Sequence, residues 1–308
     1  MFARSVAFAA ALLAGCAPAS AQVELPAGTP LPEFFVQCEE KDGWSDPAPP
    51  IRLFANVYDV GTCGIVVLLI VGDEGSVLID SGPAEAAPLV AANIERLGSA
   101  HTDVRGRNLA LADVAVILTS HEHHDHVGGV AELQRMTGAR VFAREAVIHA
   151  LETGIPDPAD PQFALRNTFP AIANVRPIGN GGKVNVGNLE LTMHPTPGHS
   201  PGSTSWSWRS CEGATCHTVA YVDSVTPVSA DSYRFTDHPD YVAAFRRSLD
   251  EIADIGCDLI VTPHPGASQL YEKLAGDAPL ASPDTCRNYA AWGREQLDAR
   301  LAREAAGK

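Results

Sequence analysis

A run of six residues, His121-Glu122-His123-His124-Asp125-His126, concentrates side chains that could bind a metal ion. Imidazole and carboxylate groups together suit zinc. On an extended backbone, residues two apart point to the same side, so His121 and His123 can share one ion, while Asp125 and His126 reach a second. Two neighbouring metal ions are typical of hydrolytic sites. The alternative is a histidine-rich surface tract that binds metal incidentally, but an apolar run precedes this hexad.

Two further histidines complete the candidate ligand set. His199 lies in Thr-Pro-Gly-His-Ser-Pro-Gly and His264 in Thr-Pro-His-Pro-Gly, each after a β-rich apolar run. A lone loop histidine is usually an ordinary surface residue, but similar Pro/Gly turns are suited to presenting ligands from strand ends. We therefore expect two zinc sites with three protein ligands each, which leaves an open catalytic position. The first site takes His121, His123 and His199, and the second takes Asp125, His126 and His264.

The remaining pattern indicates which elements position these residues. Helix-like stretches at 85–97, 130–136, 145–152, 241–255 and 288–305 alternate with strand-like runs at 65–71, 76–79, 114–119, 183–193, 203–208 and 218–222. This alternation predicts an α/β sandwich with helices outside the sheets. No linker or low-complexity tract divides the chain, so we expect a single domain over residues 22–308. An irregular stretch at 153–169 is long enough to cover a cleft, with Phe163 as a candidate substrate contact; packing within its own domain is the alternative.

The N-terminus has the features of an export signal. A short positive start at Met1–Arg4 precedes an apolar stretch too short to span a bilayer, and Ala19-Ser20-Ala21 is a small-Xaa-small cleavage site. We expect a signal peptide over residues 1–21 and a periplasmic or secreted protein. Leu13-Ala-Gly-Cys16 also resembles a lipoprotein signal, and a lipid anchor at Cys16 is therefore the alternative. No later segment is apolar enough to be a membrane span.

Six cysteines remain beyond Cys16 in the sequence of seven, an even number that suggests disulfides in an exported chain. Six cysteines allow 15 pairings. Cys211 and Cys216 flank a four-residue segment between two strand-like runs, so a hairpin would bring them together. The net charge of −15 argues against nucleic acid or an anionic membrane as a partner. We expect a monomer that acts on a small molecule.

Several segments together resemble the metallo-β-lactamase superfamily and, within it, the subclass B3 metallo-β-lactamases. The matching stretches run in the family's order and include the hexad with its flanks (120–129), Thr196–Trp206, Tyr221–Thr226 and Val261–Ser268. The resemblance implies an αββα sandwich of four layers with two Zn²⁺ ions at one edge of the sheets. It also implies hydrolysis of the β-lactam amide, and so antibiotic inactivation, by a zinc-bound hydroxide that Asp125 orients.

The resemblance assigns further roles. Ser224 matches the serine that replaces a cysteine ligand of other subclasses, and Thr226 matches a hydroxyl position implicated in holding the substrate carboxylate. His124 departs from the family pattern, and we expect it to be a non-ligand. The resemblance pairs Cys257 with Cys286. With Cys211–Cys216 also assigned, elimination leaves Cys38 with Cys63.

Two other functions stay open at this stage. A lactonase or a thioesterase resembling glyoxalase II would use an aspartate to bridge the metals, and Asp223 lies in a roughly comparable frame. If Asp223 points at the metals, that hydrolase is favoured, whereas if Ser224 faces the cleft, the lactamase is favoured. Asp223 and Asp80 are also suited to accept a hydrogen bond from a ligating histidine. The non-enzymatic alternative is an exported zinc-binding protein, against which two incomplete ligand sets argue.

Overall fold

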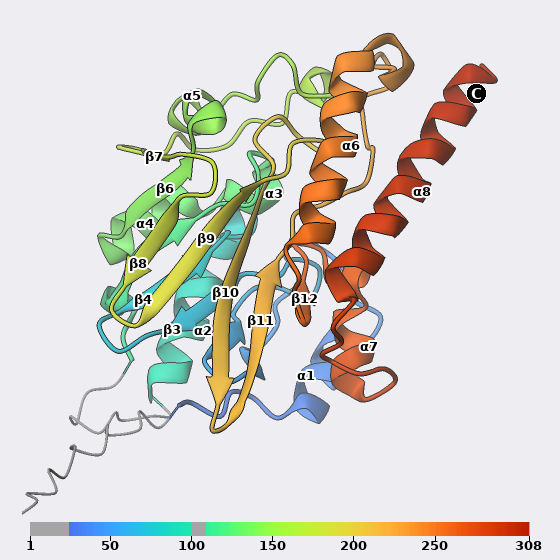
Figure 1. Cartoon of the computed structure of the whole chain (residues 1–308). Helices are drawn as coiled ribbons and strands as arrows, with labels where there is room; N and C mark the ends of the chain where they lie inside the picture. The colour runs from blue at the N-terminus through green and yellow to red at the C-terminus, as the bar shows by residue number, and fades with distance from the viewer. Residues whose placement is uncertain (1–24, 100–108, 308) are drawn as a thin grey trace, which may run out of the picture.

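The structure is a computed structural model that describes residues 25–99 and 109–307 (Figure 1). The predicted signal peptide at residues 1–21, including Cys16, lies outside the described residues. Within the described part, no helix combines the length and apolar character needed to cross a membrane.

Two sheets carry the strands. The first has the order β1-β2-β3-β4-β5-β6-β7, antiparallel from β1 to β4 and parallel from β4 to β7. The second has the order β12-β11-β10-β9-β8 and is antiparallel except for the β11–β12 pair. The strands of the first sheet are β1 (Ile51–Phe54), β2 (Val57–Asp59), β3 (Leu68–Val71), β4 (Ser76–Ile79), β5 (Val114–Leu118), β6 (Arg140–Arg144) and β7 (Arg176–Ile178). Those of the second are β8 (Lys183–Val186), β9 (Leu189–Pro195), β10 (Thr204–Glu212), β11 (Thr215–Tyr221) and β12 (Leu259–Val261).

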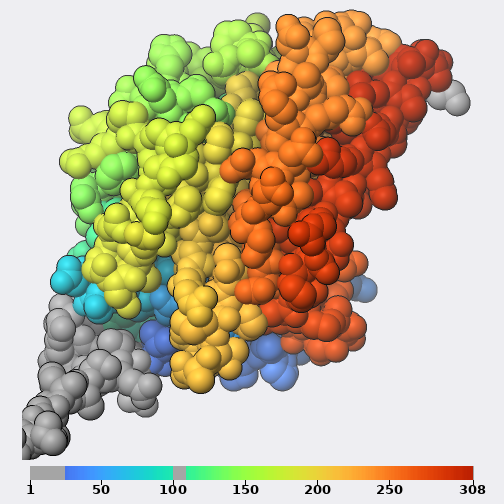
Figure 2. All heavy atoms as spheres, in the orientation of Figure 1, coloured from blue at the N-terminus to red at the C-terminus, as the bar shows by residue number. Residues whose placement is uncertain are grey.

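Helices cover the outer faces of both sheets. In Figure 1, α6 and α8 lie side by side over the second sheet, and Figure 2 shows them as adjoining orange and red ridges on that surface. The α-helices are α1 (Leu31–Cys38), α2 (Ala87–Ser99), α3 (His124–Val127), α4 (Val130–Thr137), α5 (Ile148–Thr153), α6 (Pro239–Asp254), α7 (Leu270–Ala275) and α8 (Thr285–Ala305). Short 3-10 turns include η1 (Ala84–Ala86), η2 (Leu111–Asp113), η3 (Glu145–Val147), η4 (Phe163–Leu165), η5 (Phe235–Asp237) and η6 (Pro265–Ser268).

Alternation along the buried strands creates the layers. In β3, Leu68 packs between the two sheets, whereas the next residue, Leu69, faces the helices α2 and α4. In β11, Tyr221 points into the space between the sheets, whereas Ala220 packs beneath α6 and α8. Side chains on a strand point alternately to opposite faces, so strands buried on both faces give four layers. The structure therefore confirms the expected αββα sandwich.

One expected strand was wrong. The run at 183–193 is two strands, β8 and β9, which pair as a hairpin. The turn between them contains Gly187 at φ +52° followed by Asn188, whose backbone N–H donates to Asp73 at 2.9 Å. Glycine adopts this left-handed conformation without steric cost. The apolar residues on both sides of the turn concealed this break.

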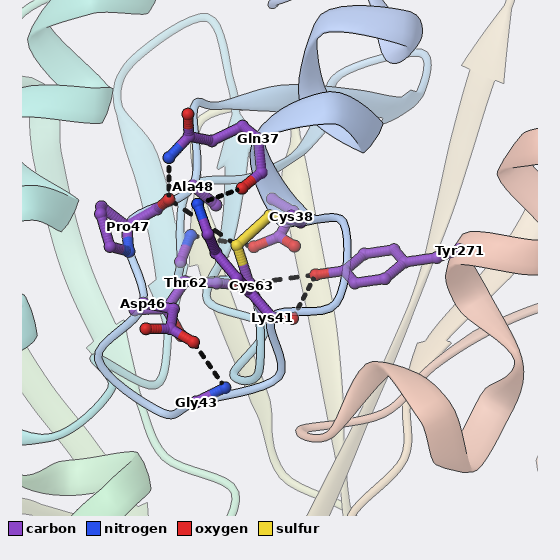
Figure 3. Close-up of a disulfide and its surroundings, with 12 residues drawn as sticks. Gln37, Cys38, Lys41, Gly43, Asp46, Pro47, Ala48, Thr62, Cys63 and Tyr271 are labelled. Carbon is purple, nitrogen blue, oxygen red and sulfur yellow. Dashed lines mark hydrogen bonds between the residues drawn. A yellow bond between two sulfur atoms is a disulfide. The ribbon is translucent and has the colours of Figure 1, made fainter.

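Among the described residues, one disulfide closes a hairpin and two others join segments that are distant in the sequence. Cys211–Cys216 closes the β10–β11 hairpin, and Cys257–Cys286 ties the segment before β12 to α8. Cys38–Cys63 links the end of α1 to the loop after β2, as Figure 3 shows. These are the pairs given by the sequence analysis, and they indicate an oxidising compartment.

Candidate metal centre

Loops at the ends of strands from both sheets bring the hexad and the two later histidines together. His121 and His123 follow β5 in the first sheet, and α3 continues the hexad. His199 lies in the loop between β9 and β10, and His264 follows β12, both in the second sheet. The centre therefore lies where the two sheets meet at one edge.

The six candidate ligands form two groups of three. His121, His123 and His199 make one group, and Asp125, His126 and His264 make the other, with the potential ligand atoms in each group within 4.8 Å of one another. The side chains are buried except for His264, which is partly exposed. His124 belongs to neither group. The grouping is the one predicted from the sequence, whereas metal binding by these residues remains a prediction.

Unpartnered nitrogen atoms fit a metal. Within the described residues, Nε2 of His121 and Nε2 of His126 are buried without a hydrogen-bond partner. The latter lies 3.0 Å from Oδ2 of Asp125 but is not aligned as a hydrogen bond. Buried polar atoms are nearly always hydrogen-bonded. These exceptions belong to two clusters of histidine and aspartate side chains, which have the donor chemistry of zinc sites.

The opposite nitrogen of each first-group histidine is held by the protein. His121 Nδ1 donates to Asp223 Oδ1, and His123 Nε2 donates to Asp160 Oδ2, both at 2.8 Å. His199 Nδ1 donates to the carbonyl oxygen of Thr226, also at 2.8 Å. Such partners fix the tautomer and the ring orientation of ligating histidines. Asp223 therefore lies behind His121 and is in neither group.

Asp80 connects the second group to both sheets. Its carboxylate accepts hydrogen bonds from the backbone N–H and the hydroxyl of Ser120, each at 2.7 Å, and from the hydroxyl of Tyr221 at 2.8 Å. His126 Nδ1 lies 3.5 Å from the same carboxylate, at the long limit of a hydrogen bond. Asp80 has a φ of +65°, a left-handed conformation that aspartate tolerates better than most residues. Asp80 thereby lies between His126 and hydrogen-bond partners from both sheets, Ser120 after β5 and Tyr221 in β11.

Burial and neighbouring charges shift the pKa values of the cluster. Burial lowers the pKa of His199 and that of His264 to about 4, aided by the neighbouring imidazoles His123 and His126, respectively, so both are neutral at pH 7. Burial opposes ionisation of Asp125, but the charge of His126 outweighs it and holds the Asp125 pKa below its usual range. Burial also opposes protonation of His126, whereas the charge of Asp125 raises the His126 pKa to about 10. A cation would displace this proton when it binds.

Glu122, which like His124 is a hexad residue outside both groups, supports the loop that contains His199. Its buried carboxylate accepts from the hydroxyl of Ser200 at 2.6 Å and from the backbone N–H of Gly202 at 3.1 Å. A Cβ on Gly202 would lie 2.2 Å from Glu122 Oε2, so only glycine permits this approach. Burial, followed by the charge of Asp160, raises the pKa of Glu122 to about 7.

The pocket over the centre has walls from three regions. The long loop contributes Pro156, Asp160, Gln162 and Asn167, so the expectation that residues 153–169 cover the cleft agrees with the structure. Thr226 and Val228 form a second wall, and Trp44 a third. Two of the predicted substrate contacts, Ser224 and Phe163, are not lining residues. Ser224 is buried, and the guanidinium of Arg166 lies 5.5 Å from the ring centroid of Phe163.

The C-terminal helix holds the second wall in place. Arg300 in α8 donates to the hydroxyl of Ser229 at 2.7 Å and to the carbonyl of Pro227 at 3.4 Å. Glu304, one turn later, accepts from the backbone N–H groups of Phe235 and Thr236. The sequence predicted only a helix at this position, and these contacts add a supporting role for the pocket.

Residues 60–214 match the family model described as the metallo-beta-lactamase superfamily. Among solved structures, the metallo-β-lactamase MIM-1 from Novosphingobium pentaromativorans is 48% identical with a TM-score of 0.82, covering 89% of this chain and 98% of that one. MEM-A1, a subclass B3 metallo-β-lactamase from a soil metagenome library, is 35% identical with a TM-score of 0.80, covering 86% of this chain and 100% of that one. BJP-1, a subclass B3 metallo-β-lactamase of Bradyrhizobium japonicum, is 30% identical with a TM-score of 0.74, covering 86% and 97%, respectively.

Curated relatives match a shorter part of the chain. A hydroxyacylglutathione hydrolase of Pseudomonas aeruginosa (strain LESB58) is 32% identical over 124 residues, which are 40% of this chain and 34% of the relative. A second, from Bradyrhizobium sp. (strain BTAi1), is 37% identical over 90 residues, 29% of this chain and 28% of the relative. The match therefore spans about one third of each relative's length.

Proposed function

The chain belongs to the metallo-beta-lactamase superfamily, and we propose that within it the protein hydrolyses the amide bond of β-lactams with the help of zinc. The observation that carries the proposal is the position of Asp223, which orients His121 and joins neither ligand group. A bridging aspartate at this position would instead favour a thioesterase or lactonase. Similarity to β-lactamases over nearly their entire length supports the same choice.

We assign one zinc ion to His121, His123 and His199, and a second to Asp125, His126 and His264. Bound there, zinc supplies Lewis acidity toward a carbonyl and lowers the pKa of a water molecule. The protein keeps His199 and His264 neutral and Asp125 ionised, which are the protonation states that bind a cation.

The remaining roles belong to residues of the pocket. Asp125 is buried among the histidines. Its carboxylate accepts a hydrogen bond from the attacking water and so orients that water. Thr226 lines the pocket and is assigned to hold the substrate carboxylate, and the buried Ser224 is assigned a water-mediated contact with the same substrate. A direct substrate contact by Phe163 stays a prediction, and the residues that the same loop contributes to the pocket lining are Pro156, Asp160, Gln162 and Asn167.

The three disulfides and the sequence of residues 1–21 support a periplasmic or secreted location, with a lipid anchor at Cys16 as the alternative. We propose a single domain over residues 22–308 that acts as a monomer. Size-exclusion chromatography with light scattering tests the oligomeric state, and mass spectrometry of the exported protein tests cleavage after Ala21.

Hydroxyacylglutathione hydrolysis is the second candidate, because curated relatives with that name match part of the chain. Purified protein should be assayed with nitrocefin, a chromogenic β-lactam, and with S-lactoylglutathione, each before and after treatment with EDTA. We expect nitrocefin hydrolysis that EDTA abolishes and zinc restores, with little thioester turnover. Preference for the thioester would reverse the assignment, and full activity without metal would overturn the zinc centre.

A pair of histidine variants provides a matched control. His264→Ala removes a proposed ligand, and we expect it to lower both bound zinc and nitrocefin turnover. His217→Ala removes a histidine outside the pocket, whose Nδ1 lies 3.8 Å from Asp258 Oδ2. This change should leave zinc content and turnover unchanged.

A further inference from the structure

Trp44 places a large apolar surface at the edge of the metal pocket. The residue is 45% exposed and lines the pocket. The ring centroid lies 5.6 Å from that of His124 and 6.0 Å from that of His264. Both neighbouring imidazoles face the same cavity, so a molecule bound over the second ligand group would meet the indole.

A tight turn fixes the backbone that carries Trp44. The carboxylate of Asp46 accepts from the backbone N–H of Gly43 at 2.9 Å, and the backbone N–H of Asp46 donates to the Gly43 carbonyl at 3.1 Å, so both bonds span Trp44. Figure 3 shows this Gly43–Asp46 contact beside the disulfide. A Cβ on Gly64 would lie 2.1 Å from the carbonyl oxygen of Asp42. The turn therefore packs directly on the loop that precedes β3.

The Cys38–Cys63 disulfide anchors that turn to the loop and to α1. The backbone N–H of Cys63 donates to the carbonyl of Asp46 at 2.9 Å, and Gln37 Nε2 donates to the carbonyl of Pro47 at 3.2 Å. On the other side, the Tyr271 hydroxyl donates to the carbonyl of Cys63 at 3.2 Å, as Figure 3 shows. The backbone N–H of Val66, three residues after Cys63, donates to the carbonyl of Pro263, the residue before His264, at 2.8 Å. The bridge and these bonds thus hold the indole and a proposed zinc ligand in one unit.

We propose that Trp44 is a specificity-determining residue that binds an aromatic or flat apolar substituent on the acyl side chain of a β-lactam, and that the Cys38–Cys63 disulfide preorganises it. This inference rests on the proposed β-lactam hydrolysis. An exposed indole offers a wide stacking surface at small entropic cost, since it has only two side-chain torsions. A preformed turn removes the further cost of ordering a loop when substrate binds.

A substrate pair that differs in the aromatic group tests the proposal. Benzylpenicillin carries a phenylacetyl side chain, and 6-aminopenicillanic acid has the same fused rings without it. We expect Trp44→Ala to lower kcat/KM for benzylpenicillin roughly tenfold, mainly through KM, because an aromatic contact and its buried area are lost. Turnover of 6-aminopenicillanic acid should change less than about twofold. Trp44→Phe should restore most of the benzylpenicillin efficiency.

Val36→Ala is the matched control, because Val36 is an exposed apolar residue of α1 outside the pocket. It should leave the efficiencies for both substrates unchanged. If Trp44→Ala alters both substrates equally or neither, the role of Trp44 is wrong while β-lactam hydrolysis stands. If the wild-type protein hydrolyses neither compound, the proposed function fails, and the substrate assignment for Trp44 fails with it.

The disulfide is tested by combining variants. Cys38→Ser with Cys63→Ser should reduce the preference for benzylpenicillin in the wild-type background but not in the Trp44→Ala background. Asp46→Ala keeps the disulfide but breaks the turn, so it should produce the same loss of preference for benzylpenicillin. It replaces the cysteine variant in this test if that variant does not fold. If both variants fold and keep the preference for benzylpenicillin, preorganisation by the disulfide is wrong. It is also wrong if either change lowers the preference equally in the wild-type and Trp44→Ala backgrounds.

Discussion

Replacement of Asp223 separates an orienting residue from a bridging metal ligand. Asp223 and His121 are both fully buried, and their hydrogen bond is 2.8 Å long. In Asp223→Ala, His121 loses the acceptor that fixes its ring, while the three first-group residues remain. Loss of such a partner costs about 10–100-fold in metal affinity or activity, or roughly 1.4–2.7 kcal/mol. We expect zinc affinity and nitrocefin turnover to decline within that range.

Three comparison variants make the result decisive. Asp125→Ala removes a proposed ligand and should lower zinc content and turnover by orders of magnitude, on the order of 10²–10³-fold or more. Asp223→Asn retains an acceptor oxygen and should be milder than Asp223→Ala. Ser224→Ala removes the water-mediated contact proposed for this hydroxyl, a neutral hydrogen bond worth roughly 0.5–1.5 kcal/mol, and should keep its zinc.

Elemental analysis counts zinc per chain, competition with a chromophoric chelator gives its affinity, and nitrocefin hydrolysis gives turnover. Collapse of the zinc content in Asp223→Ala to the level of Asp125→Ala would make Asp223 a ligand and favour the thioesterase or lactonase. Unchanged affinity and turnover in Asp223→Ala would refute the orienting role.

Three other features give measurable expectations. Replacing Cys257 and Cys286 with serine should lower the free energy of unfolding in urea by about 3–4 kcal/mol, since the bridge spans 29 residues; a loss below about 1 kcal/mol would contradict this. Burial raises the pKa of Asp59 from 3.8 to about 7. Between these pH values the folded chain keeps a proton that the unfolded chain has released. The free energy of unfolding therefore falls as pH rises through this range, by on the order of 4 kcal/mol in total. Asp59→Asn should remove this decline in urea titrations from pH 4 to 8, and a parallel pH dependence in both proteins would count against it. Arg300→Met should raise the KM for nitrocefin several-fold, about 3–10-fold if one charge-assisted hydrogen bond is lost, with zinc content unchanged; an unaltered KM would show that α8 does not hold the pocket wall.

Local spacing predicted the ligand groups, because the hexad places several donors on adjacent backbone positions and the two Pro/Gly turns mark strand ends. The same reasoning missed Asp160 and Trp44. Asp160 reaches His123 from a loop 37 residues away, and Trp44 reaches His264 only because the Cys38–Cys63 bridge and the fold bring their segments together. Neither residue lies in a local pattern that indicates a site.

Phe163 shows how little the sequence says about the direction of a loop side chain. An apolar residue in a long loop beside a cleft was a reasonable substrate contact, but the loop turns through η4 and presents Gln162 and Asn167 to the pocket instead. Which side a loop residue faces depends on turn geometry and long-range packing. The hairpin at Gly187 was missed for a related reason, since apolar residues continue on both sides of it.

The position of the six proposed ligands has a thermodynamic consequence. Four of them follow β5 in the first sheet, and His199 and His264 belong to loops of the second. An ion bound to either group therefore acts as a non-covalent cross-link between the sheets, and only the folded chain offers all its donors. Its binding free energy adds to folding, by about 4 kcal/mol when free zinc exceeds the dissociation constant a thousandfold. Scarcity of zinc should thus reduce the lifetime of the folded protein as well as its turnover.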